Sequence, residues 1–161
     1  MTPASKHFIP YASVLAGILM IGTAALHAEP PRVHLVHMGG DDCPPCVAWR
    51  QFELPKLQES EVFKSIQFSY VIKSIGSPVP SGFFLPAEVK PLKEKLDISS
   101  GGNGGSPQAA LIVNDVVYDY WFGPRTAAEI EKMIVAVQSG TQYPFNRCTK
   151  RAKGWRCIEH G

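Results

Sequence analysis

Two cysteines separated by two prolines, Cys43-Pro44-Pro45-Cys46, constrain this chain more than any other feature of its sequence. They follow residues 33–38, a short apolar run rich in β-forming residues that Gly39-Gly40 ends. Such a run predicts a buried strand. Proline is tolerated in the first helical turn because its missing N–H would have no partner there, so a helix is expected from Pro44. The sequence therefore predicts a dithiol at a strand-to-helix junction.

The remaining elements follow from periodicity and breakers. The helix from Pro44 is expected to kink or split at Pro55 and to continue to about Phe63. Further predictions are a strand over 66–72, a loop over 74–85, a short helix over 87–96 interrupted or begun anew at Pro91, a flexible connection over 99–105 and strands over 108–113 and 116–122. The two-residue linker Asn114-Asp115 predicts an antiparallel hairpin between the last two strands.

The last predicted helix begins with a capping box, Thr126 with Glu129, and ends at Gly140. The order is then β-α-β, a long insertion with a helix, and β-β-α. A β-α-β crossover requires a parallel strand pair, and the hairpin adds antiparallel strands. We therefore expect an α/β fold, with one mixed four-stranded sheet flanked by helices. The length of 161 residues suits one domain.

Residues 1–28 resemble an export signal. The only charged side chain among them is Lys6, an apolar run spans residues 14–26, and Leu26-His27-Ala28 ends in a small residue that suits cleavage. The alternative is an uncleaved membrane anchor, because residues 8–26 are just long enough to span a bilayer. Either way the folded part, residues 29–140 and a tail, is expected outside the cytoplasm, in the periplasm or otherwise exported. Disulfides persist there.

Residues 141–161 form a basic tail, which we expect to be irregular. The net charge of the whole chain, +2, and the lack of basic stretches interleaved with aromatics argue against nucleic acid as a partner. The tail contains Cys148 and Cys157, and the even cysteine count in an oxidising compartment favours a structural disulfide between them. The alternative is a second redox pair, although nothing near these cysteines prepares a thiolate.

The dithiol is expected to do redox chemistry. A thiolate is the nucleophile in disulfide exchange, and a helix start stabilises it through the dipole and through backbone N–H groups. With Cys43 at the cap position, the N–H of Cys46 can point at the Cys43 sulfur. Cys43 is then the exposed nucleophile, and Cys46, one turn inside the helix, is the resolving thiol.

Neighbouring residues bias the direction of this chemistry. Pro44 and Pro45 lack N–H donors, and the carboxylates of Asp41 and Asp42 disfavour a further anion. These features argue against a very acidic thiol, so the sequence favours a reductase or exchange function over a strongly oxidising one.

The arrangement resembles the thioredoxin superfamily, and specifically its exported thiol–disulfide oxidoreductases. The resemblance rests on Cys43-Pro44-Pro45-Cys46 after the first strand and on Ser106-Pro107 before the strand over 108–113, and it covers most of residues 33–138. It implies a thioredoxin-like fold with an insertion before the cis-proline strand. It also implies that Pro107 is cis and faces the dithiol, and that the backbone of Ser106 pairs with an extended client segment. Implied partners are protein thiol or disulfide clients and an upstream redox partner, with no cofactor. A membrane is implied only through the N-terminal segment, if that segment is not cleaved.

The chain departs from this family at two places. An aromatic residue commonly precedes the first cysteine, but here Asp42 does. A buried acid often lies six residues before that cysteine and assists proton transfer, but here the position is His37, on the same strand face as Val33 and Leu35. A histidine there is a candidate catalytic residue. The alternative is a hydrogen-bonded core histidine.

The insertion carries Phe83, Phe84 and Leu85, which could shape a client surface but are expected to pack as core, as large apolar side chains usually do.

The rival function is the handling of a soft metal ion such as Cu(I) by Cys43 and Cys46, with His37 and Met38 nearby. Strand alternation would point these last two side chains to opposite faces, and two prolines suit a helix start better than a metal loop. A zinc site is weaker, because Cys148 and Cys157 lack the short ligand spacing. We predict no metal site. A third class, a non-catalytic binding module of the same fold, is disfavoured by the intact cysteine pair.

Overall fold

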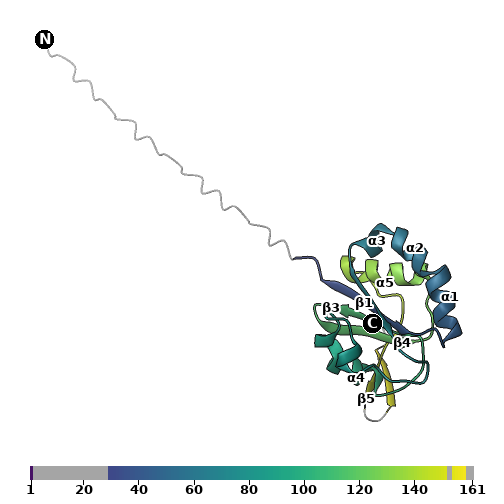
Figure 1. The fold of residues 1–161 in the computed structure, drawn as a ribbon. Coiled ribbons are helices and arrows are strands. Elements are labelled where there is room, and N and C mark those ends of the chain that lie inside the picture. The colour runs from purple at the N-terminus through teal and green to yellow at the C-terminus, as the bar shows by residue number, and fades with distance from the viewer. Residues whose placement is uncertain (2–28, 152–153, 159–161) are drawn as a thin grey trace.

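The computed structural model describes Met1, residues 29–151 and residues 154–158, with only the backbone from residue 148 onward (Figure 1). The strands are β1 (Val33–Gly39), β2 (Gln67–Ile72), β3 (Gln108–Val113), β4 (Val116–Phe122), β5 (Arg147–Arg151) and β6 (Gly154–Ile158). The helices are α1 (Pro44–Phe52), α2 (Leu54–Glu59), α3 (Glu61–Lys64), α4 (Lys93–Ser100) and α5 (Ala127–Ser139), with short 3-10 turns at η1 (Gly82–Phe84) and η2 (Lys90–Leu92).

Four strands form one mixed sheet in the order β2-β1-β3-β4. β1 pairs in parallel with β2 and antiparallel with β3, and β3 pairs antiparallel with β4. The parallel pair is the one that the β-α-β crossover requires. The predicted fold class, a mixed four-stranded sheet flanked by helices, is confirmed.

The helices α1, α2, α3 and α5 cover one face of the sheet (Figure 1). Strand alternation points Val33 and Leu35 of β1 toward this layer, where they pack with Trp49 of α1 and Met133 of α5. Pro55 splits the predicted long helix, as expected, and α1 ends at Phe52 before α2 begins at Leu54. This face contains the larger of the two cores and carries α1, whose start bears the dithiol.

The segment between β2 and β3 covers the opposite face. Val36 and Met38 of β1 pack there against Val89, Leu92 and Leu96. The predicted helix over 87–96 lies further along the chain, as η2 followed by α4, which ends at Gly101 in the left-handed conformation. The expected flexible connection over 99–105 is therefore wrong at its start, where Ser99 and Ser100 are helical and buried.

Phe83 and Phe84 contradict the expectation that they pack as core. Their side chains are 85% and 72% exposed, whereas Leu85 is 4% exposed and belongs to the second core. The 3-10 turn η1 explains the difference, because its tight winding turns both rings outward before the chain resumes an extended path at Leu85.

The turn and cap predictions are confirmed. Asn114 and Asp115 both have positive φ, as a two-residue hairpin turn requires. The Thr126–Glu129 capping box is present, and Gly140 ends α5 with φ 66°.

The tail differs from expectation. It is not irregular, because β5 and β6 form an antiparallel hairpin that lies beside β4 and α4. Its strands are charged and lack the apolar alternation by which strands are predicted.

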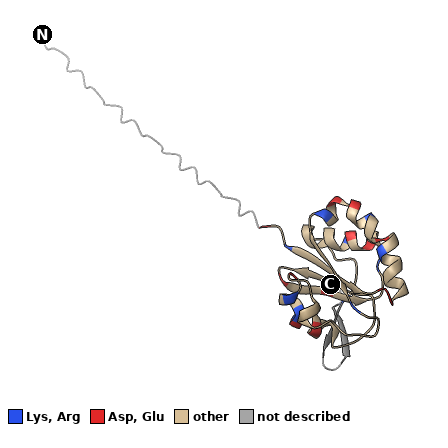
Figure 2. Cartoon of the chain, in the orientation of Figure 1, with Lys and Arg blue, Asp and Glu red and all other residues tan. Residues whose placement is uncertain are grey.

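The predicted signal or anchor, residues 1–28, lies outside the described residues apart from Met1. Within the described part, no helix is long and apolar enough to cross a membrane. The charged residues seen on the helices are of both signs (Figure 2).

Candidate redox site

Cys43 and Cys46 form a disulfide at the start of α1, with their Cα atoms 5.2 Å apart. Cys43 has an extended backbone at the N-cap position, and Pro44 and Pro45 occupy the first helical turn. The N–H of Cys46 donates to Cys43 Sγ over 3.3 Å, which is the contact that the sequence predicted for a cap sulfur. The helix start therefore presents its positive end to the Cys43 sulfur.

Cys43 is not exposed in this disulfide form, contrary to the expectation. Both Cys43 and Cys46 have an exposed fraction of 0%. The physical reason is the cap geometry, because a cap side chain folds back over the first turn toward the backbone N–H of Cys46 rather than out to solvent. Pro44 and Pro45, between the two cysteines, are the exposed residues of the motif.

The two acids before the motif are both engaged. Asp41 forms an ion pair with Arg50, from the second turn of α1. Asp42 Oδ2 accepts a hydrogen bond of 3.0 Å from the N–H of Ile75. The negative charge next to the dithiol is therefore partly compensated, which the linear sequence did not indicate.

His37 lies in a stack of rings. Its imidazole is stacked on Trp49, with ring centroids 3.8 Å apart, and on Tyr70, 5.4 Å apart. It is on the β1 face that also carries Val33 and Leu35, as predicted. Burial, assisted by the positive charge of Arg50, lowers the pKa of His37 to about 3, so the imidazole is neutral near neutral pH. Its Nδ1 has no hydrogen-bond partner among the described residues.

Gly39 and Gly40 allow the strand end to approach the site closely. A Cβ on Gly39 would lie 2.5 Å from Cys46 Sγ and 3.2 Å from Tyr70 Oη. A Cβ on Gly40 would lie 2.4 Å from the carbonyl oxygen of Lys73. Glycine is therefore required at both positions by space, and not only as a strand breaker.

The segment over 73–76, which we call the clasp, joins the dithiol loop to the loop before β3. On the dithiol side, the N–H of Lys73 donates to Gly39 O, and Ile75 contacts Asp42 as described. On the other side, the N–H of Gly105 donates to Ile75 O. The ammonium of Lys73 donates to Gly105 O over 2.6 Å and to Ser106 Oγ over 2.9 Å.

Lys73 is 4% exposed, and burial lowers the pKa of its ammonium, against the opposing effect of Asp42.

The Ser106–Pro107 peptide bond is cis, as the resemblance implied. Among the described residues, no backbone hydrogen bond engages the N–H or the C=O of Ser106. Pro107 O accepts a hydrogen bond from the N–H of Gly123, which fixes this loop to the end of β4.

Sequence reasoning missed three residues of this site, namely Tyr70, Lys73 and Gly39 as a spacer. The sequence places Tyr70 only within a strand. The available signal was its face, because the side chains at positions 68 and 70 of β2 lie on the same side of the sheet as His37. Lys73 follows directly after a strand, where a charged residue is unremarkable.

The two residues named beside the dithiol for a soft-metal site, His37 and Met38, do not come together. Met38 packs in the second core while His37 stacks on Trp49 in the first, so the two side chains lie on opposite faces as alternation predicts. Within the described residues there is no group of three or more His, Cys, Asp or Glu side chains placed to hold a metal. The side chains of Cys148 and Cys157 lie outside the description, but their backbones are direct partners in the β5–β6 hairpin.

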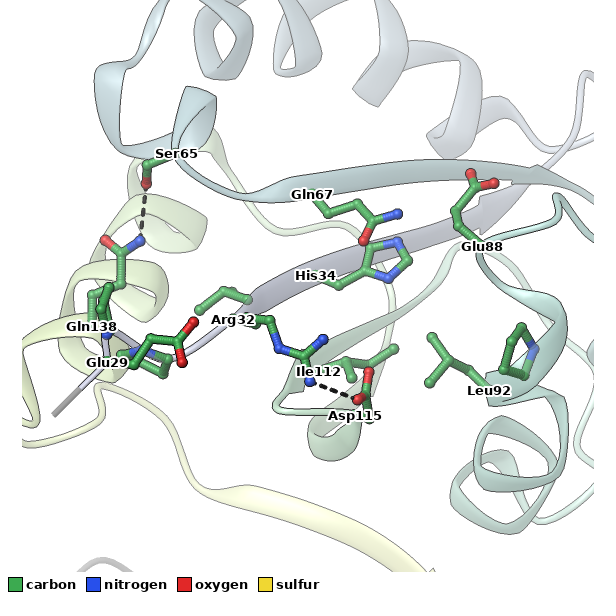
Figure 3. Close-up of a pocket in the computed structure, with 14 residues that line it drawn as sticks. Glu29, Arg32, His34, Ser65, Gln67, Glu88, Leu92, Ile112, Asp115 and Gln138 are labelled. Carbon is green, nitrogen blue, oxygen red and sulfur yellow. Dashed lines mark hydrogen bonds and ion pairs between the residues drawn. The ribbon is translucent and has the colours of Figure 1, made fainter.

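Two of the hollows in the described part of the chain lie near opposite ends of β1. A small apolar one, about 300 Å³, adjoins the dithiol and is lined by Pro45, Ala48, Phe52 and Pro124 among others. A second one, about 550 Å³ and with a mixed polar and apolar lining, lies at the other end of β1 (Figure 3). Beside it, His34 Nε2 and Ser69 Oγ are 3.0 Å apart, and Ser69 donates to Glu88. Because β1 runs between them, this second hollow is separate from the redox site.

The sequence matches no protein-family model and no curated protein. Several solved structures are similar in fold, and three of them are described here. One is a thiol:disulfide interchange protein of the thioredoxin family from Chlorobium tepidum TLS, with a TM-score of 0.43 and 19% identity over 66% of this chain and 80% of that one. The second is the N-terminal domain of PilB from Neisseria gonorrhoeae, with a TM-score of 0.41 and 18% identity over 66% and 77%. The third is DsbH oxidoreductase, with a TM-score of 0.41 and 15% identity over 68% and 74%.

Proposed function

We propose that this protein is a thiol–disulfide oxidoreductase that exchanges disulfides with protein clients through Cys43 and Cys46. One observation carries the proposal: Cys43 is the cap residue of α1, and its sulfur accepts a hydrogen bond from the N–H of Cys46. This contact and the helix dipole favour the thiolate of Cys43 when the pair is reduced. Cys46, one turn further into the helix, is the resolving thiol.

The exchange proceeds in two steps in the reductive direction. The Cys43 thiolate attacks a client disulfide, forms a mixed disulfide and releases one client sulfur as a thiolate. Cys46, after losing its proton, attacks Cys43 Sγ, closes the 43–46 bond and releases the second client sulfur. The client disulfide is reduced and the protein is oxidised, so an upstream dithiol must reduce the protein again.

We favour reductase or exchange activity over strong oxidation. Pro44 and Pro45 bring no N–H to the Cys43 sulfur, which leaves Cys46 as its backbone donor. The pairing of Asp41 with Arg50 weakens the second argument, which relied on the acids. The preference for reductase or exchange activity therefore rests mainly on the prolines, and a redox titration against glutathione tests it. A potential as high as that of dedicated disulfide oxidants, about −120 mV, would contradict it.

Ser106 and Pro107 are proposed to bind the client. The backbone of Ser106 has no partner among the described residues, so it is available to pair with an extended peptide. Lys73 holds the Ser106 hydroxyl from the clasp side, which leaves the backbone groups as the contact for a client.

The experiment that tests the function is reduction of insulin disulfides by the purified protein, with Cu(I) binding measured on the same sample. Cys43→Ser should abolish the reductase activity, and Cys46→Ala should trap clients as mixed disulfides. The matched control is the pair Cys148→Ser and Cys157→Ser, which should keep the activity. Unchanged activity in Cys43→Ser would refute the enzymatic function. Tight Cu(I) binding without reductase activity would favour the metal-handling alternative.

We also propose that the protein acts outside the cytoplasm, in the periplasm or a similar exported location. The proposal relies on residues 1–28 as a cleaved signal, or as an anchor if they are retained. The mass and N-terminal sequence of the mature protein distinguish the two, with cleavage after Ala28 as the expected result.

A further inference from the structure

Tyr70 of β2 carries a hydroxyl that is buried and has no hydrogen-bond partner among the described residues. Native structures satisfy nearly all buried polar groups, so such an exception calls for an explanation. The mechanism proposed above does not use this hydroxyl.

The hydroxyl and the sulfur of the resolving cysteine both lie next to Gly39. The point where a Gly39 Cβ would lie is 3.2 Å from Tyr70 Oη and 2.5 Å from Cys46 Sγ. Both atoms therefore lie against the side of Gly39 that carries no Cβ.

The ring of Tyr70 is held in this direction by its neighbours. His37 stacks on it, with ring centroids 5.4 Å apart, and the guanidinium of Arg50 lies 5.4 Å from the ring centroid. Arg50 is itself fixed by its ion pair with Asp41. The hydroxyl is thus aimed by packing and does not depend on a hydrogen bond of its own.

The surrounding charges favour a donor role for this hydroxyl. Burial raises the pKa of Tyr70, so it keeps its proton near neutral pH. His37 of β1 is neutral, and the positive charge of Arg50 on α1 is compensated by Asp41 of the preceding loop. Lys73 and Asp42, next along the clasp and the loop, are engaged with Ser106 and with Ile75. Tyr70 is then the neutral O–H group that borders the Cys46 sulfur.

We propose that, in the reduced protein, Tyr70 donates a hydrogen bond to the Cys46 thiolate and thereby promotes the resolving step. This inference rests on the proposed function and assigns a role that the sequence did not suggest.

In the mixed disulfide, the Cys46 thiol releases its proton to solvent, and the Tyr70 hydroxyl stabilises the resulting anion. The thiolate attacks Cys43 Sγ and forms the 43–46 bond, while the bond between Cys43 and the client sulfur breaks. The client sulfur leaves with the bonding electron pair and takes a proton from solvent. Tyr70 keeps its own proton throughout.

The test is Tyr70→Phe, which removes the hydroxyl and keeps the ring that stacks on His37. The matched control is Tyr118→Phe on β4, a tyrosine that packs on Tyr143. In chemically reduced protein, the pKa of the Cys46 thiol is followed through its 13Cβ chemical shift during a pH titration. Tyr70→Phe should raise this pKa by about one unit, because a hydrogen bond to a charged group is worth about that much. Tyr118→Phe should leave it unchanged.

A kinetic measurement separates this role from a structural one. The mixed disulfide between Cys43 and glutathione, formed with oxidised glutathione, is quenched with acid at intervals and counted by mass spectrometry. In Tyr70→Phe, the Cys46 thiolate of higher pKa is scarcer but more nucleophilic. The mixed disulfide should therefore decay about threefold more slowly in this variant than in the wild type at neutral pH. At a pH above the Cys46 pKa of both proteins, the mixed disulfide should decay no more slowly in the variant than in the wild type.

The outcomes distinguish the two proposals. An unchanged Cys46 pKa in Tyr70→Phe overturns the role of Tyr70, as does a rate deficit that persists at high pH. Failure of oxidised glutathione to form the mixed disulfide in the wild type overturns the proposed function instead, and the titration of the reduced protein still decides the role of Tyr70.

Discussion

At the scale of the residue, the site depends on what is missing at position 39. Gly39 is the last residue of β1, and the absent Cβ makes room for the sulfur of Cys46. A strand residue is rarely a glycine, because glycine weakens strands, and close approach of another group is one reason to find it there.

Gly39→Ala should therefore lower the free energy of unfolding by about 1–3 kcal/mol, the usual cost of overpacking a core. The control is Gly82→Ala, where a Cβ would meet no atom within 4 Å and the change should stay within about 0.5 kcal/mol. Denaturant unfolding of the oxidised proteins measures both. Equal stability of the two variants would mean that the strand end relaxes without cost.

The buried imidazole of His37 should make the free energy of unfolding depend on pH. Its pKa is lowered by burial to about 3 in the folded protein and should be near 6.5 when unfolded. Between these values the unfolded chain binds more protons, so stability is full above pH 6.5 and is lost as the pH falls toward 3.

From pH 7 to 5 this one group should cost about 2 kcal/mol of unfolding free energy. His34, whose pKa is also lowered chiefly by burial, adds a loss of the same sign. His37→Phe, which can still stack on Trp49, should make the decline shallower. Denaturant unfolding at several pH values above 5 avoids most carboxylate protonation. An unchanged slope in the variant would show that another group is responsible.

At the scale of the element, the clasp makes two loops dependent on each other. It is bonded to the dithiol loop at Gly39 and Asp42, and to the cis-proline loop at Gly105 and Ser106. The two loops are far apart in the sequence. The clasp should therefore fix the position of Ser106 relative to the dithiol.

Lys73→Met removes the ammonium from its acceptors on Gly105 and Ser106 while keeping the apolar stem. If Ser106 pairs with clients, loosening it should raise KM for a protein disulfide about fivefold, or about 1 kcal/mol, with a smaller change in kcat. The control is Lys90→Met, at an exposed lysine of η2. Steady-state insulin reduction gives both constants. A loss confined to kcat would place Lys73 in the chemistry instead.

At the scale of the whole molecule, we propose that the four cysteines form two pairs with different tasks. The 43–46 pair caps a helix, whereas Cys148 and Cys157 are opposite each other in a terminal hairpin. Directly opposed strand residues have Cα separations that a disulfide can bridge.

Mild reduction should open the 43–46 bridge first, as peptide mass spectrometry after alkylation can show. Replacing Cys148 and Cys157 together by serine should lower the free energy of unfolding by about 2–4 kcal/mol and leave disulfide exchange intact. Equal resistance of the two bridges to reduction would argue against this division.

Much of this architecture could be predicted from local signals. The cap at Cys43, the break at Pro55, the turn at Asn114 and the box at Thr126 each depend on short-range rules, and each is present. What could not be predicted depends on contacts between distant segments. The pairing of Asp41 with Arg50, the reach of Lys73 to Ser106 and the approach of Tyr70 to Cys46 follow from how strands and loops meet. The tail hairpin was missed because its residues show no apolar alternation.

The position of Trp49 on α1 also has a practical consequence for spectroscopy. Trp49 lies one helical turn after Cys46, within the range at which a disulfide quenches indole emission. Reduction should therefore brighten one of the three tryptophans, and the fluorescence of the unlabelled protein would follow its redox state in real time.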